Sequence, residues 1–419
     1  MNAPAQFVRT VADLLADPHT APGVTKANRQ QLAYGMPGIA LLHVERAIAG
    51  LGPWQRVHDW LSAAARQPFT SGPDSHPFYG APALAHAVAC AAEHLPGPYQ
   101  RALDRLDRQM EADVRGRLAA AHERMDDGGL ARISEFDTIR GLTGYGAHLL
   151  RRDPASALVR SVLEYLVRLT SPVTCDGESL PGWWTATGPS GRVNDRFPGG
   201  HGNSGLAHGI AGPLALLSLA ALRGTVVPGQ YGAIRTILTW LDRWRQDTSD
   251  GTVWPYWVTR AELREDLLTS SAPRRPSWCY GTAGLTRAQQ LAALVLKDAR
   301  RQAAAERALL RSLSEGTQLK ATNDKGLCHG FAGLAHVAVR ASADAGPSNS
   351  RRLRAVVPAL VDEICPAVGD PVAAARAIVR DGTTGPGFLD GAAGVALALQ
   401  TCVTAVPPQS AWDACLLIA

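Results

Sequence analysis

The chain has 419 residues, of which 46% are hydrophobic and 19% are charged, and its net charge is +5. This length and composition are typical of an ordinary globular protein with a large buried core. The positive charge is spread along the chain, and most arginines stand singly or in pairs beside acidic residues. A nucleic-acid-binding protein would carry a clustered basic stripe with aromatic residues, so we expect no nucleic-acid partner.

The N-terminal segment MNAPAQFVRTVADLLADPHTAP lacks the basic region and apolar run of a signal peptide. The most apolar stretch, GLAHGIAGPLALLSLAALRG, contains His208 and Pro213 and is a poor membrane span. The seven cysteines are odd in number and thinly scattered, which favours free thiols or metal ligands over a disulfide framework. We therefore expect a cytoplasmic protein with no transmembrane segment.

A glycine turn is repeated along the chain, and each copy opens a run rich in Ala, Leu and Val with few charges. The copies read, in chain order, YGMPGIALL, YGAPALAHA, RGLTGYGAHLL, HGIAGPLALL, YGTAGLTRA, HGFAGLAHV and DGAAGVALAL, with first glycines Gly35, Gly80, Gly141, Gly209, Gly281, Gly330 and Gly391. The second copy is imperfect because Ala83 replaces its closing glycine. Such repetition predicts a repeat architecture in which each run is a largely buried helix.

Amphipathic segments lie between the copies. SALVRSVLEYLVRLT precedes the fourth copy and AIRTILTWLDRWR follows it, and their apolar positions recur every three or four residues. Strand signals are sparse, and GTVWPYWVT at residues 251–259 is the best candidate for a short strand. Each copy with its amphipathic neighbour therefore predicts one helical hairpin.

A closed ring accommodates both kinds of helix in seven such hairpins. It buries the apolar helices inside and places the amphipathic helices outside, with one face toward solvent. An open solenoid would need polar caps at its ends and gives no reason for inner helices as apolar as these. We predict a single all-α domain over residues 1–419. Its fold is an α/α toroid, a double ring of seven inner and seven outer helices that can also carry a short β insertion.

The glycine turns also predict a site. A Gly-x-x-Gly turn lets the chain enter a helix where a Cβ would clash, and parallel inner helices would gather the turns at one end of the barrel. The residues just before each first glycine are Tyr34, Tyr79, Arg140, His208, Tyr280, His329 and Asp390. Taken singly, each is an ordinary residue for a helix start, but together they predict a polar mouth.

Two cysteines stand at this mouth, because Cys279 precedes Tyr280 and Cys328 precedes His329. Adjacent helices lie about 8–10 Å apart, close enough for their side chains to share one ion. Two thiolates and an imidazole suit zinc, and three protein ligands leave the fourth position open, as in catalytic sites. The alternative is a pair of buried free cysteines with a capping histidine.

The blocks GLAHGIAG, SWCYGTAG and LCHGFAG resemble the three signature blocks of the LanC-type lanthionine synthetase cyclases, the ring-forming enzymes of lanthipeptide biosynthesis. The resemblance covers essentially the whole chain through the repeated turn and the total length. It implies an α/α toroid with one Zn²⁺ ion, whose ligands are Cys279, Cys328 and His329.

The same resemblance implies four catalytic residues. His208 matches the general acid/base, and Asp137, Arg275 and Tyr280 match the remaining polar active-site positions. Asp137 also has an ordinary interpretation as a helix cap. Arg275 stands beside Arg274 and has an ordinary interpretation as a surface charge.

A zinc-bound cysteine is deprotonated, and two protein thiolates on the same ion keep a third, incoming thiolate nucleophilic. We therefore expect a peptide cysteine to add to dehydroalanine or dehydrobutyrine of the same peptide. His208 would protonate the resulting enolate, and Arg275 would stabilise its oxygen. The product is a lanthionine or methyllanthionine thioether ring.

Three alternatives stay open at this point. A LanC-like enzyme that adds a glutathione-type thiol to dehydrated residues would share every one of these residues. A zinc-thiolate S-prenyltransferase would use an Asp-Cys-His ligand set, and a non-catalytic peptide-binding toroid would use the metal for structure only.

The expected partner is a dehydrated precursor peptide, made of leader and core. Because the chain shows no fused kinase-like or lyase-like sequence, we expect a separate dehydratase and a transport or maturation complex. The Trp-rich loops at residues 171–202 and 250–277 are longer than ordinary turns, and either contact substrate or cover the barrel.

Overall fold

The structure is a computed structural model that describes residues 2–66, 68–249, 251–269, 275–314 and 316–419. It is mostly helical. The α-helices are α1 (Ala3–Leu14), α2 (Met36–Ile48), α3 (Trp54–Ala65), α4 (Ala81–Ala92), α5 (Pro96–Asp126), α6 (Ile133–Phe136), α7 (Leu142–Arg152), α8 (Ala157–Leu169), α9 (Ala211–Leu222), α10 (Gln230–Arg243), α11 (Arg260–Glu265), α12 (Thr282–Leu296), α13 (Ala299–Ser314), α14 (Gly316–Lys320), α15 (Phe331–Asp344), α16 (Pro347–Ile364), α17 (Pro371–Arg380) and α18 (Ala392–Thr404). Two short 3-10 helices are η1 (Gly72–Asp74) and η2 (Trp412–Leu416).

The chain divides into two compact units. The first unit consists of residues 1–110 and 322–413, and the second of residues 111–321 and 414–419. The first unit holds the glycine turns that precede α2, α4, α15 and α18, and the second holds those that precede α7, α9 and α12. The single domain expected over residues 1–419 stays a prediction.

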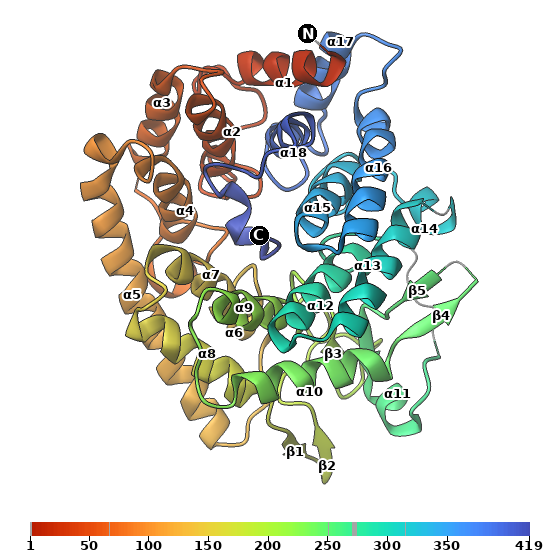
Figure 1. Cartoon of the computed structure of the whole chain (residues 1–419). Coiled ribbons are helices and arrows are strands. Elements are labelled where there is room, and N and C mark those ends of the chain that lie inside the picture. Colours follow the sequence, from red (N-terminus) through yellow and green to blue (C-terminus); the bar gives the residue numbers. More distant parts are fainter. Residues whose placement is uncertain (1, 67, 250, 270–274, 315) are drawn as a thin grey trace. The chain divides into compact units, whose positions relative to one another are not determined.

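Helical hairpins follow the glycine turns, as predicted. Every residue of α4 is buried, and α2, α9, α12 and α18 are buried over most of their length. Within the first unit, α2 packs against α3 and α15 against α16, and within the second α7 packs against α8 and α12 against α13 (Figure 1). The partner helices bury one face only, as their sequence pattern requires.

Neighbouring turns are joined by backbone hydrogen bonds with a fixed register. The carbonyl two residues before a first glycine accepts N–H groups from the same region of another turn. In the first unit, Cys328 donates to Leu389 over 2.9 Å and Leu389 donates to Ala33 over 3.0 Å. In the second unit, Thr138 donates to Ala207 over 3.0 Å, and Ala207 donates to Cys279 over 3.1 Å. These bonds satisfy backbone groups that the loops would otherwise bury without partners.

The closing glycines are required by close packing rather than by their φ angles. A Cβ on Gly333 would lie 2.0 Å from the carbonyl oxygen of Leu327, and one on Gly284 would lie 1.9 Å from that of Trp278. Each helix therefore begins pressed against its own preceding loop. The imperfect second copy has Ala83 in place of a closing glycine. Its first glycine, Gly80, has a φ of 75°, in the left-handed region that favours glycine.

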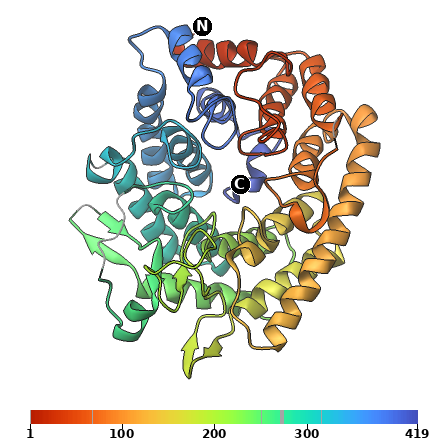
Figure 2. The ribbon, with the colours of Figure 1, turned by 180° about the vertical axis from the view of Figure 1, so that it is seen from behind.

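In the described part of the second unit, the predicted β insertion is present as three two-stranded antiparallel sheets. They pair β1 (Val173–Cys175) with β2 (Glu178–Leu180), β3 (His201–Asn203) with β6 (Trp257–Thr259), and β4 (Gln246–Thr248) with β5 (Gly251–Val253). The β1–β2 hairpin projects from this unit, as Figure 2 shows. The single strand expected over residues 251–259 is divided into β5 and β6, because Pro255 cannot donate a ladder hydrogen bond.

Within the described residues, no helix is both long enough and apolar enough to cross a membrane.

The close contact of the closing glycine gives a stability prediction. Gly333→Ala pushes a methyl group into the Leu327 carbonyl, and overpacking of this kind costs about 1–3 kcal/mol. We expect a thermal melt to show a Tm several degrees below that of the wild type. The control is Gly116→Ala on α5, where an added Cβ meets nothing within 4 Å and should keep or raise the Tm. Equal melting temperatures for the two variants would contradict this account of the turn.

Candidate active site and metal centre

A group of metal-binding side chains lies at two glycine turns of the first unit. Cys328, His329 and Asp390 each offer one ligand atom, and these atoms all lie within 4.8 Å of one another. Cys328 and His329 precede α15, and Asp390 precedes α18. The hydrogen bond from the Cys328 N–H to the Leu389 carbonyl holds the two loops in register.

His329 is oriented by a second carboxylate. Its Nδ1 lies 2.6 Å from Oδ2 of Asp324, so Nδ1 carries the proton and donates it. The Asp324 carboxylate also accepts the backbone N–H of Gly326 over 3.1 Å. Gly330 admits this carboxylate, since a Cβ there would lie 2.2 Å from Asp324 Oδ1. The other ring nitrogen, Nε2, is therefore the atom that His329 could offer to a metal ion.

Asp390 uses its two oxygens differently. Oδ2 accepts the hydroxyl of Tyr34 over 2.9 Å. Oδ1 is buried, has no hydrogen-bond partner, and lies 3.6 Å from Nε2 of His329. Burial, together with the neighbouring Asp390 carboxylate, raises the pKa of Tyr34 above its ordinary value, so Tyr34 stays a hydrogen-bond donor at neutral pH.

Cys279 belongs to the second unit, where its loop is firmly held. Its side chain is 6% exposed, and Sγ lies 3.5 Å from Oγ of Ser277. Its carbonyl accepts the N–H groups of Leu206 and Ala207, which links it to the turn that carries His208. Its role as a metal ligand stays a prediction.

His208 and Asp137 form a close pair in the second unit. Nδ1 of His208 lies 2.6 Å from Oδ2 of Asp137, whose side chain is fully buried. The carboxylate accepts a hydrogen bond from Nδ1–H, so Nε2 is the ring nitrogen that could exchange a proton with another group. About a third of the His208 side chain is exposed, which gives that nitrogen access to solvent.

The two oxygens of Asp137 have different partners, and its catalytic role stays a prediction. Its Oδ1 accepts the backbone N–H groups of Arg140 and Gly141 over 2.7 and 2.8 Å, which caps the turn before α7. Its Oδ2 holds His208. One carboxylate therefore fixes the turn and orients the histidine.

Tyr280 and Arg275 lie in the same unit. The Tyr280 ring is 6.1 Å from that of His208, and its hydroxyl accepts Nδ2 of Asn203 over 3.4 Å. Arg275 hydrogen-bonds to the hydroxyl of Tyr256, whose ring stands 5.1 Å from Tyr280. Burial raises the pKa of Tyr256, and the Arg275 guanidinium opposes that rise. The structure thus brings His208, Asp137 and Tyr280 together and places Arg275 beside Tyr256.

Sequence reasoning missed several of these neighbours. Asp390 and Tyr34 were recognised only as residues that precede a glycine, and Asp324 carried no separate signal. The signal available in the sequence was an acidic residue a few positions before the first glycine of a turn. Asp137 lies four residues before its turn glycine, and Asp324 lies six residues before Gly330.

The tryptophans of the long loops are mainly structural. Trp183, Trp184 and Trp254 are at most 4% exposed, and Nε1 of Trp184 donates to the Gly199 carbonyl. This packing favours a covering role over direct substrate contact. Positions 250 and 270–274 of the second loop, including Arg274, lie outside the described residues.

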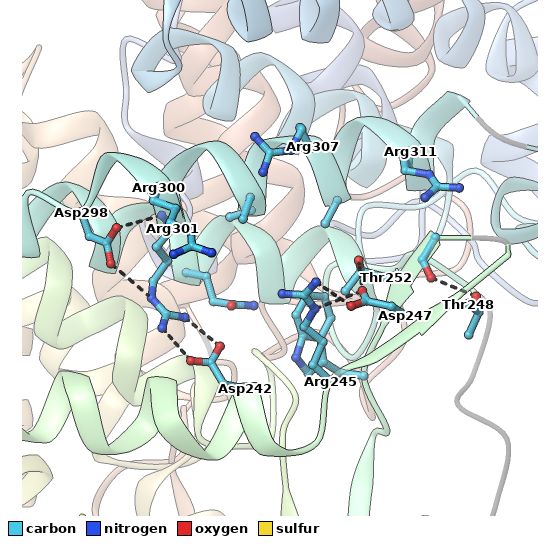
Figure 3. A pocket seen from close by; sticks show the side chains of 16 residues that line it. Asp242, Arg245, Asp247, Thr248, Thr252, Asp298, Arg300, Arg301, Arg307 and Arg311 are labelled. Carbon is cyan, nitrogen blue, oxygen red and sulfur yellow. Dashed lines mark hydrogen bonds and ion pairs between the residues drawn. The ribbon is translucent and has the colours of Figure 1, made fainter.

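A cavity of about 690 Å³ lies in the second unit, between α10, α13 and the β4–β5 hairpin. Figure 3 shows the side chains that line it. Five arginines line it, and two of them form ion pairs: Arg301 with Asp242 over 2.6 Å and Arg245 with Asp247 over 2.6 Å. None of the predicted site residues lines this cavity.

Repeated glycine turns, a Cys-His-carboxylate group that could hold a metal ion and a His–Asp pair together define a class of helical protein. Residues 26–417 match the family of lanthionine synthetase C-like proteins, and the chain belongs to that family. This confirms the predicted resemblance.

The solved structure of nisin cyclase has the same fold. The match has a TM-score of 0.73 at 21% identity and covers 94% of this chain and 93% of that one. Because nisin cyclase is an α/α toroid, the match confirms the predicted fold class.

A second similarity is to the nisin biosynthesis protein NisC of Lactococcus lactis subsp. lactis. The two are 24% identical over 248 residues, which is 57% of this chain and 56% of NisC. The chain therefore spans little more than half the length of that relative.

The His208–Asp137 pair gives a prediction that does not depend on an assay of activity. In Asp137→Asn, the amide oxygen still caps the turn, but its NH₂ group faces Nδ1 of His208 and forces the proton onto Nε2. We expect nitrogen-15 NMR of the histidines to show that change of tautomer for His208. His201 serves as the internal control, since its Nδ1 faces the Thr187 carbonyl over 2.8 Å and should not change.

The matched variant for capping is Asp137→Ala, which removes both interactions and should cost about 1 kcal/mol of stability. An unchanged His208 tautomer in Asp137→Asn would contradict the orienting role of this carboxylate.

Proposed function

We propose that this chain is a zinc-dependent lanthipeptide cyclase. It adds peptide cysteine thiolates to dehydroalanine or dehydrobutyrine in the same dehydrated precursor peptide and forms lanthionine or methyllanthionine rings. The single observation that carries the proposal is the group of Cys328, His329 and an unpartnered carboxylate oxygen in a member of this family.

The residues present fit a zinc ion. A thiolate and an imidazole are the donors that zinc prefers. The Asp324–His329 hydrogen bond fixes the ring tautomer, as carboxylates hydrogen-bonded to ligating histidines do in zinc sites. The buried Oδ1 of Asp390 lacks a hydrogen bond, as expected of an atom whose partner is a cation. Cys328 and His329 would hold the ion, with Cys279 as the third ligand that the sequence predicts.

When bound, zinc would supply thiolate stabilisation at neutral pH, because a coordinating thiol is deprotonated. The remaining work falls to the chain's own residues. They bind and orient the peptide, deliver a proton and stabilise the charge of the enolate.

His208 is the proposed proton donor to the α-carbon of the enolate. Its Nδ1 proton is committed to Asp137, so the transferable proton is on Nε2. The buried carboxylate stabilises the imidazolium that exists before transfer and keeps the ring in one orientation. Proton transfer by a positioned histidine contributes about 10²–10⁴-fold to a rate.

Arg275 and Tyr280 are proposed to act on the substrate beside His208. A guanidinium is suited to stabilise the developing negative charge on the enolate oxygen. Tyr280, in ring contact with His208, would help to position the substrate and the histidine.

The proposed partner is a dehydrated precursor peptide of leader and core, supplied by a separate dehydratase and passed to a transport or maturation complex. The cytoplasm is the proposed location. The names nisin cyclase and nisin biosynthesis protein NisC support a peptide substrate for the relatives, and we extend that class of substrate to this chain.

The experiment that tests the function combines metal analysis with a thiol assay. Purified wild-type protein should contain one zinc per chain and consume the free thiols of a dehydrated precursor without added thiol. Cys328→Ala should lose both zinc and activity, whereas His208→Ala should keep zinc and lose about 10²-fold or more in rate. Cys402→Ala on α18 is the control cysteine and should change neither.

If His208→Ala and Cys328→Ala consume thiol as fast as the wild type, the cyclase proposal is wrong. Mass spectrometry of the product separates an internal ring, which leaves the mass unchanged, from addition of an external thiol such as glutathione, which increases it.

A further inference from the structure

A cavity of about 530 Å³ lies in the first unit, at the helix ends that point away from the glycine turns. It is lined by α1, by the loop between α2 and α3, and by the last residues of α18. Both α1 and α2 pack against α18 (Figure 1). Gln400, which lines the cavity, follows Asp390 by ten residues, so about 15 Å of helix separates the cavity from the Cys-His-carboxylate group. Its volume is typical of a small-molecule site.

Arg46, in the last turn of α2, lines this cavity as a buried cation without a carboxylate of its own. It is 7% exposed, its Nη2 donates to the Leu51 carbonyl over 2.8 Å, and its buried Nε has no hydrogen bond within the described residues. The nearby Asp13 instead pairs with Arg56 over 2.9 Å and with Arg9 over 3.7 Å. Burial lowers the pKa of Arg46, and Asp13 opposes that fall. A buried guanidinium in this state calls for an anion.

Gln400 supplies a second unused polar group in the same cavity. Its side chain is 6% exposed, and its buried Oε1 has no hydrogen-bond partner in the part of the chain that the structure describes. A carboxamide both accepts and donates, so it is complementary to another amide group. Because a buried polar group without a partner costs free energy, Gln400 indicates a ligand that carries an amide next to its negative charge.

The remaining wall of the cavity is apolar. Val8 of α1 is buried there, whereas Leu51 and Val403 are 52% and 37% exposed and stand among the large hydrophobic side chains that face solvent. Covering such side chains with an apolar group removes their surface from water and stabilises the complex by about 25 cal/mol per Å². The ligand that fits all three features therefore combines a carboxylate, an adjacent amide and an apolar side chain.

We propose that this cavity binds an N-acylated apolar amino acid, a chemistry that the C-terminal residue of a peptide also presents. The carboxylate pairs with Arg46, and the adjacent amide hydrogen-bonds to Gln400. The apolar side chain packs against Val8, Leu51 and Val403. The site is separate from the proposed metal centre and does not depend on the cyclase activity.

Saturation-transfer difference NMR with purified full-length protein and N-acetyl-L-leucine tests the proposal. We expect the leucine methyl groups to receive the strongest saturation, because they contact the apolar wall. N-acetyl-L-leucinamide lacks the charge and should bind at least about 10-fold more weakly, since hydrogen bonds to charged groups are the stronger ones. Acetate lacks the apolar side chain and should also bind at least about 10-fold more weakly.

Two variants test the polar contacts. Gln400→Leu should weaken N-acetyl-L-leucine binding at least about 5-fold and keep or raise the Tm, because it removes a buried group that has no hydrogen-bond partner. Arg46→Gln should weaken binding at least about 10-fold, and a thermal melt checks that it is folded. Gln55→Leu on α3 is the matched control, since Gln55 bonds to Asp59 at the surface, and it should bind like the wild type.

The tripeptide Ala-Ala-Leu distinguishes the two sources of this chemistry. Binding as tight as that of N-acetyl-L-leucine would support the proposal with a peptide C-terminus as the source, and weaker binding would support it with a free N-acylated amino acid. Equal affinities for N-acetyl-L-leucine and its amide would overturn the inference, as would wild-type affinity in folded Gln400→Leu and Arg46→Gln. Removal of zinc should leave the affinity unchanged, so this test is independent of the metal centre.

Discussion

The contact between each closing glycine and the carbonyl of its own loop is the constraint on which the rest of the structure depends. A Cβ at Gly333 or Gly284 would stand about 2 Å from a backbone oxygen, so only glycine lets the helix begin this close to the preceding residues. That closeness aligns the loops, and the N–H groups of one turn then reach the carbonyl of another. The residue before the first glycine is thereby held at a fixed position in every such turn.

The same constraint organises the chemistry. In the second unit the turn carries His208, and in the first it carries His329. Each histidine donates an Nδ1–H hydrogen bond to a carboxylate oxygen 2.6 Å away. Asp137 and Asp324 thus fix the ring tautomers, and in each case Nε2 is left for function. We propose that one of these nitrogens moves a proton and that the other binds zinc. A repeated backbone device therefore supports two different tasks.

Much of this was predictable from the sequence because it is local. The glycine spacing and the apolar runs are each contained in about ten residues, and they sufficed for the helical hairpins. The contacts that complete the site are not local. Tyr34 and Asp390 are 356 positions apart, and only the packing of α2 against α18 brings their turns together. The division of residues 251–259 into β5 and β6 likewise depended on which strands each segment pairs with.

The central claim is that two sulfurs and one imidazole share a zinc ion. Zinc K-edge X-ray absorption of the purified, metal-loaded protein tests it most directly, because sulfur and nitrogen neighbours give distinct distances. The account predicts two sulfur neighbours at about 2.3 Å, with the remaining ligands nitrogen or oxygen at about 2.0–2.2 Å. A spectrum that contains only nitrogen and oxygen neighbours would contradict it.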